Sequence, residues 1–197
     1  MVTQSPPRPN NPMDCYAPSF DVTDTLVLVI DEEPETLREA LEALDLTAPV
    51  VRALEALGAS DRLALAPTLL AIEPGPALVF GLVWRYDGPA AAVDPARVRA
   101  FDLPGHVKVI WNVQVRPGGL EGAVLSSTRR FAATDDAARA RLLDGWGVIG
   151  TVAKSVSRRI LATIEMHAEE CAERGRAPGS LSAEMPSASM LSTVTAA

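Results

Sequence analysis

Apolar residues near the start of the chain follow first a strand-like pattern and then a helical one. Residues 25–30 (TLVLVI) form a short continuous apolar run rich in β-branched side chains, which predicts a buried strand. The acidic pair at 31–32, followed by Pro34, is typical of a helix start. Leucines at helical spacing from Leu37 onward, interrupted at 45–48, predict two short helices after this strand.

Strand patterns fill the middle of the chain. They lie at 62–66, 69–73, 77–86, 106–116 and 122–132. The clearest is 106–116, and Pro117-Gly118-Gly119 after it predicts a hairpin turn to the last of them. One face of 106–116 is apolar, whereas the other carries Lys108, Ile110, Asn112, Gln114 and Arg116. This alternation predicts a sheet with one buried and one wetter face.

A long amphipathic helix is predicted near the C-terminus. Thr134 is a favourable N-cap residue, and the helix is expected to run to about Arg174. Three glycines, at 145, 147 and 150, interrupt its sequence. Each costs about 1 kcal/mol relative to alanine, so we expect a kink, a break or a close packing contact there.

This order of elements predicts an α+β fold in which a curved antiparallel sheet wraps around the long C-terminal helix. The predicted domain spans 22–174 and includes the two short helices after the first strand. Residues 1–21 are rich in proline, and residues 175–197 are mainly Ser, Ala, Pro and Thr. Both segments are expected to be disordered ends.

Charge and composition exclude several classes of function. The formal net charge of −7 argues against a nucleic-acid partner. The longest apolar run, 77–84, is far shorter than the roughly 18 residues that a membrane span needs. Cys15, in the first of these ends, and Cys171, close to the second, do not form a disulfide framework. With no signal-peptide pattern in the first residues, a cytoplasmic protein without membrane insertion is expected.

Several stretches resemble one group of proteins. They are DEEPETLREALEALDL (31–46), GLVWRY (81–86), FDLPGHVKVIWNVQV (101–115), LSSTRRF (125–131) and RARLLDGWGVIGTVAKSVSRRIL (139–161). Together with the order of elements, they resemble uncharacterised actinobacterial members of the SRPBCC (START-like, helix-grip) superfamily. The resemblance implies a cavity for a hydrophobic molecule but no catalytic residue. Ser127 stands where that group tends to have an acid, and Trp84 where it has a small residue.

We expect a ligand cavity between the sheet and the C-terminal helix, lined by side chains that parity and helical spacing place on the inward faces. These are Trp84, Val109, Trp111, Val113, Leu125, Ser127, Arg129, Trp146 and Ile149. The alternative is a filled core, because tryptophan and valine at strand spacing are mostly core residues. Among them Arg129 is expected to anchor a ligand carboxylate or another anion, or else to form a structural ion pair with an acid such as Asp144.

Other polar residues give weaker signals. Asn112, Gln114 and Thr128 are expected on an exposed sheet face. His106 and His167, the two histidines, lack metal-ligand spacing and are expected at the surface. No phosphate loop, dinucleotide fingerprint or nucleophile elbow is present, so no cofactor and no metal are expected.

The sequence therefore leaves three hypotheses for the function. The first is binding of a lipid- or polyketide-like small molecule in the cavity, without catalysis. The second is an enzyme of the polyketide cyclase or dehydratase kind, which needs an acid within reach of the cavity. The third is a ligand-free interaction module, which predicts a filled core and an exposed apolar patch.

Overall fold

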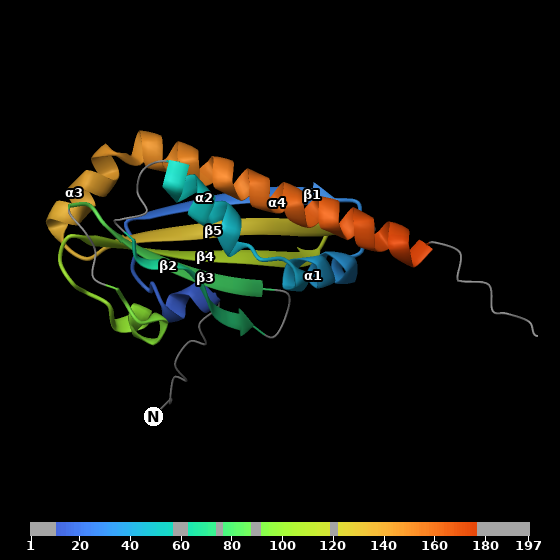
Figure 1. Ribbon diagram of the computed structural model, residues 1–197, viewed down its shortest axis with the longest axis horizontal. Helices are drawn as coiled ribbons and strands as arrows, with labels where there is room; N and C mark the ends of the chain where they lie inside the picture. Colours follow the sequence, from blue (N-terminus) through green and yellow to red (C-terminus); the bar gives the residue numbers. More distant parts are fainter. Residues whose placement is uncertain (1–10, 57–62, 74–76, 88–91, 119–121, 177–197) are drawn as a thin grey trace, which may run out of the picture.

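The computed structural model describes residues 11–56, 63–73, 77–87, 92–118 and 122–176. Five antiparallel strands form one sheet in the order β1-β5-β4-β3-β2. Their bounds are β1 (Val22–Ile30), β2 (Leu63–Glu73), β3 (Ala77–Arg85), β4 (His106–Pro117) and β5 (Ala123–Ala133). The long helix α4 (Trp146–Arg176) lies along one face of this sheet (Figure 1). The predicted helix-grip α+β fold is thereby confirmed.

The short helices α1 (Pro34–Ala43) and α2 (Thr47–Ala56) follow β1 and pack against α4. Pro34 opens α1 with an acidic residue in the first turn, as the sequence predicts. Helix α1 buries Leu37 and Leu41 on the side that meets the core. The two helices therefore close the sheet–α4 interface over the C-terminal part of α4.

Strand β2 is continuous where two short strands were predicted. Its pairing with β3 contains register shifts on both sides of Pro67. Because β2 is an edge strand, a residue without a backbone N–H is tolerated there. Pro67 therefore distorts this strand without ending it.

The predicted C-terminal helix is in fact two helices. Helix α3 (Asp136–Asp144) ends at Gly145, and α4 begins at Trp146. Gly150 packs against the Trp146 ring, where an added Cβ would lie 3.0 Å from a ring carbon. The glycines thus produce both a break and a close contact, two of the three outcomes expected from the sequence.

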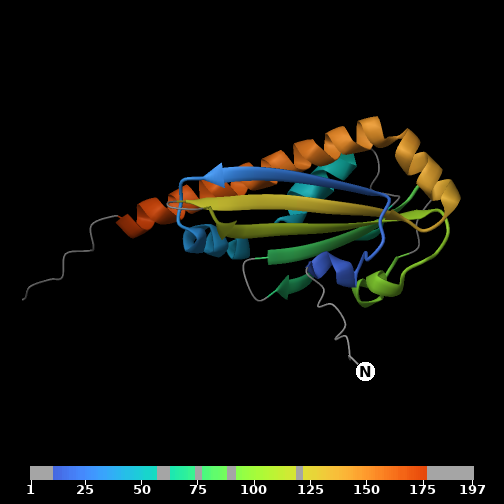
Figure 2. The ribbon, with the colours of Figure 1, turned by 180° about the vertical axis from the view of Figure 1, so that it is seen from behind.

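The face of the sheet away from α4 is also covered, by the 3-10 helices η1 (Pro12–Cys15) and η3 (Pro95–Ala100) (Figure 2). An apolar cluster lies between these helices and the sheet, and Met13 of η1 and Ile110 of β4 are both fully buried in it. The expectation of a wetter outer face therefore holds only in part along β4, because Ile110 and Asn112 are buried whereas Lys108 and Gln114 are partly exposed. The structure extends N-terminal of the predicted boundary at residue 22, because Met13 and Ala17 have apolar partners on the sheet.

Both cysteines lie in elements of secondary structure, which contradicts the expectation of disorder for Cys15. Cys15 belongs to η1 and Cys171 to α4, and both are free thiols. Residues 1–10 and 177–197 of the two predicted ends lie outside the described residues.

Candidate functional site

Two apolar clusters fill the interface between the sheet and α4, and a set of buried polar groups lies between them. We call this set the polar layer; it consists of Asp24, the Trp111 indole N–H, Ser127, Arg129 and Ser157. Strand β1 supplies Asp24, β4 supplies Trp111, β5 supplies Ser127 and Arg129, and α4 supplies Ser157. The layer therefore joins three neighbouring strands to the helix that covers them.

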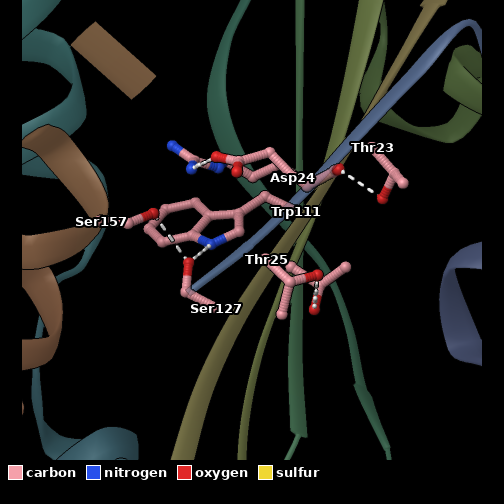
Figure 3. A network of polar contacts seen from close by, with 8 residues as sticks. Thr23, Asp24, Thr25, Trp111, Ser127 and Ser157 are labelled. Atoms are coloured by element: carbon pink, nitrogen blue, oxygen red, sulfur yellow. Dashed lines mark hydrogen bonds and ion pairs between the residues drawn. The ribbon is translucent and has the colours of Figure 1, made fainter. Parts of the chain in front are cut away.

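The first half of the polar layer is a chain of hydrogen bonds from sheet to helix (Figure 3). The Trp111 Nε1–H donates to Ser127 Oγ at 2.7 Å, and Ser127 Oγ shares a hydrogen bond of 2.8 Å with Ser157 Oγ. Ser127 and Ser157 are fully buried. This chain satisfies the indole N–H inside an apolar interface, where an unpaired donor would be costly.

The second half of the polar layer is the ion pair between Arg129 and Asp24. Their side chains are only 6% and 12% exposed. Burial lowers the pKa of the Arg129 guanidinium, and the Asp24 carboxylate acts in the opposite direction. The Arg129 Nε–H is buried and has no hydrogen-bond partner. One donor of this guanidinium is therefore free inside the interface.

Asp24, and not Asp144, is the partner of Arg129. Asp144 lies at the end of α3, whereas Asp24 pairs with Arg129 in the register of β1 and β5. The alternation of β1 places Asp24 on the same inward face as Leu26 and Leu28. This alternation could have identified Asp24 as an inward-facing residue. Asp24 lies just before the apolar run 25–30, however, and was therefore left out of the predicted strand.

Ser157 was also missed, although it lies within the amphipathic helix that the sequence predicts up to about Arg174. A serine interrupts the apolar face of such a helix and does not stand out as a partner for the sheet. The structure instead buries it opposite Ser127.

The predicted cavity residues fall on both sides of the polar layer. Val113 and Leu125 join Trp111 in the cluster that packs on the C-terminal half of α4. The remaining four belong to the cluster at the N-terminal half of α4: Trp84, Val109, Trp146 and Ile149. Ser127 and Arg129 lie in the polar layer itself.

The two ends of the interface differ in how tightly they pack. Along the C-terminal half of α4, Ile160, Leu161 and Ile164 are fully buried. Along the N-terminal half, Trp146 and Ile149 are only partly buried. The interface is therefore more open to solvent near the α3–α4 break.

Aromatic rings line this more open end. The Phe131 ring lies between two tryptophans, with centroid distances of 4.9 Å to Trp146 and 6.2 Å to Trp84. Tyr86 contacts Trp84 edge-on, and its buried hydroxyl has no partner. Burial raises the pKa of the Tyr86 phenol to about 12. This end thus combines large apolar surfaces with one unsatisfied hydroxyl.

Several polar residues lie elsewhere than expected. Asn112 is buried on the η1 and η3 side of the sheet, and its Oδ1 has no partner. Gln114 and Thr128 on that side are partly exposed. His106 is buried, because its ring packs edge-on against Phe101 and its Nδ1 lies 2.8 Å from the Pro104 carbonyl oxygen. The prediction of surface positions is therefore wrong for Asn112 and His106.

Within the described ranges, no group of three or more His, Cys, Asp and Glu side chains is placed to hold a metal ion. No helix in the part of the chain that the structure describes is long and apolar enough to cross a membrane.

No protein-family model and no curated protein matches this chain. Among solved structures, it is similar to the protein TTHA0849 from Thermus thermophilus, at 11% identity and a TM-score of 0.40, covering 76% of this chain and 99% of that one. It is also similar to the Zhui aromatase/cyclase from a Streptomyces species, at 16% identity and a TM-score of 0.32, covering 80% and 98%. Human STARD10 follows at 12% identity and a TM-score of 0.31, covering 77% and 65%. At these TM-scores no function transfers to this chain.

Proposed function

We propose that the protein binds a hydrophobic or amphipathic small molecule between the sheet and α4, with a polar group of that molecule at the polar layer. The observation that carries this proposal is the buried Arg129 Nε–H without an acceptor. Leaving a buried donor unpaired costs about 1–3 kcal/mol. A ligand that supplies an acceptor at this point would recover that free energy.

The ion pair with Asp24 indicates which polar group fits. Because the Asp24 carboxylate already balances the charge of Arg129, the layer lacks a hydrogen-bond acceptor and not a negative charge. Burying a further anion beside Asp24 would add repulsion between like charges. The ligand is therefore a neutral molecule with a carbonyl or similar acceptor, which replaces the carboxylate anchor expected from the sequence.

The apolar part of the ligand would extend toward the N-terminal half of α4. Trp146 and Ile149 there are only partly buried, so they can move apart at lower cost than the fully buried residues beyond Ser157. The break at Gly145 lies beside this end of the helix. Entry of the ligand near the α3–α4 break follows from this difference in packing.

Acid–base catalysis on a bound molecule is the second candidate, and Asp24 is the observation that favours it. Asp24 is a carboxylate on the inward face, as a cyclase or dehydratase would need. It is held by Arg129, however, so a substrate would have to break this ion pair before reaching the carboxylate. Binding without turnover is therefore the function that the geometry supports best.

A titration with methyl octanoate, a neutral molecule with a carbonyl acceptor, tests the binding proposal. The three tryptophan indole N–H groups are expected to give separate NMR signals, and all three rings belong to the clusters between sheet and helix. We expect saturable shifts of the Trp111 and Trp146 signals. Signals that stay unchanged up to the solubility of the ester would contradict the proposal.

A further inference from the structure

A surface groove between α2 and α4 lies apart from the polar layer. Its volume is about 440 Å³. It is lined from α2 by Pro49, Arg52 and Ala56, and from α4 by Arg159, Ala162, Thr163 and Met166. Figure 1 shows α2 beside α4. On α4 the groove residues Arg159 and Ala162 are exposed, whereas Ile160 and Leu161 between them are buried.

Two arginines from different helices line this groove. In the described part of the chain, neither the Arg52 nor the Arg159 guanidinium makes a hydrogen bond or an ion pair. Arg38, Arg139 and Arg141 on the same protein each have a carboxylate partner. Two guanidinium groups without a hydrogen-bond or ion-pair partner among the described residues therefore lie beside one groove, in a chain with a net charge of −7.

The carboxylates around the groove leave both guanidinium groups available. Asp45 interacts electrostatically with Arg52, but its carboxylate accepts hydrogen bonds from the backbone N–H and the hydroxyl of Thr47. Glu55 of α2 is exposed and does not line the groove. On α4, Glu165, Glu169 and Glu170 likewise lie outside the lining. Among the described residues, none that lines the groove carries a negative charge.

The remaining lining residues are mostly apolar. Pro49, Ala56 and Ala162 have no polar side-chain atoms, and Met166 is 55% exposed. The Thr163 hydroxyl donates to the Arg159 carbonyl oxygen at 2.8 Å, so its proton is engaged within the helix. The groove thus offers an apolar surface and two cationic groups, a combination that suits a molecule with one anionic end.

We infer that this groove is a second binding site, for a small amphipathic carboxylate. The carboxylate contacts Arg52 and Arg159, for which guanidinium forks are geometrically suited. The hydrocarbon part lies over Ala56, Ala162 and Met166. The volume falls within the range of about 300–1,000 Å³ typical of small-molecule sites. This site is independent of the proposed function, since the interior prefers a neutral ligand and the groove an anion.

Octanoate is the probe, with the neutral octanol of equal chain length as its control. In amide NMR spectra of the full chain, we expect saturable octanoate shifts at Ala56, Ala162 and Thr163. The Trp111 indole signal reports on the interior site and separates failure of one proposal from failure of the other. Octanol is expected to bind the groove about tenfold more weakly, because it lacks the charge-assisted hydrogen bonds.

The double variant Arg52→Gln/Arg159→Gln is expected to lose about tenfold in octanoate affinity at the groove. Arg97→Gln/Arg158→Gln is the matched control: it removes the same two charges from exposed residues that do not line the groove. Equal affinity for octanoate and octanol, or an equal loss in the control, would overturn the inference. A dimer that protects the same amides without octanoate would place a second copy of the chain in the groove and would also overturn it.

Discussion

The indole N–H of Trp111 on β4 donates to the Oγ of Ser127 on β5 at 2.7 Å, with both side chains buried. Across these strands Trp111 stands directly opposite Arg129, and Ser127 opposite Val113. The hydrogen bond therefore runs diagonally, toward Ser157 of α4 and away from the ion pair. The polar layer is thus divided into a satisfied half at Ser127 and an incompletely satisfied half at Arg129.

Replacing Ser127 by alanine should destabilise the fold. The Trp111 indole N–H would lose its acceptor inside the interface, which costs about 1–3 kcal/mol. Urea denaturation of Ser127→Ala measures this loss. Ser126→Ala is the control, because Ser126 lies on the opposite face of β5, and its effect should stay within about 0.5 kcal/mol. Equal stabilities of the two variants would show that the buried chain of hydrogen bonds contributes nothing.

Removing the charge of Asp24 should have a larger effect. Asp24→Asn leaves the buried Arg129 guanidinium without a counter-charge, which we expect to cost about 3–5 kcal/mol in the free energy of unfolding. Asp136→Asn removes a carboxylate of the same kind from the ion pair with Arg139, where Asp136 is 98% exposed. That control should cost less than about 1 kcal/mol. If Asp24→Asn costs no more stability than this control, the ion pair between Asp24 and Arg129 is not buried as described.

The unequal packing of α4 predicts an unequal response to truncation. Leu161→Ala removes a fully buried side chain and should cost about 2–5 kcal/mol. Ile149→Ala removes a partly buried one at the more open end and should cost clearly less. Thermal or urea unfolding of both variants tests the difference. Similar losses at both positions would mean that the interface is closed along its whole length, which would remove the proposed entry.

The lowered pKa of Asp135 predicts that part of the protein's folding stability is lost at low pH. Hydrogen bonds from the backbone N–H groups of Ala138 and Gly105 hold the pKa of this carboxyl below its ordinary value of 3.8. A carboxyl whose pKa is lower in the folded state stabilises the fold above its unfolded pKa, and this contribution is lost as the pH falls through the folded pKa. The stability difference between the wild type and Asp135→Asn should therefore be largest near neutral pH and shrink below 3.8. A difference that does not change with pH would contradict this role.

The order of strands and helices was predictable because local patterns encode it. Alternation in 106–116 and the stripe of apolar residues around Ile160 each need only a few neighbouring positions. Local patterns do not encode which residues are partners inside the polar layer. Asp24 and Arg129 are separated by 105 residues, and only the pairing of β1 with β5 brings them together.

The cover of the outer face was unpredictable for a related reason. The residues of η1 have no periodicity, and their proline content is typical of disorder. Burial of Met13 instead depends on the shape of the sheet surface around Ile110, which no local pattern reveals. Sequence parity placed Trp111, Ser127 and Arg129 on one inward face, and the structure agrees. Whether the nine predicted residues contact a ligand stays a prediction.

The affinity of Arg129→Lys for methyl octanoate tests the central claim most directly. Lysine keeps a positive charge beside Asp24 but lacks the Nε–H that is free in the wild type. Arg130→Lys makes the same change one residue along β5, on the outward face. If the free Nε–H anchors the ligand, Arg129→Lys should bind the ester about tenfold more weakly than the wild type while Arg130→Lys binds it equally well. Equal affinity of all three proteins would contradict the account.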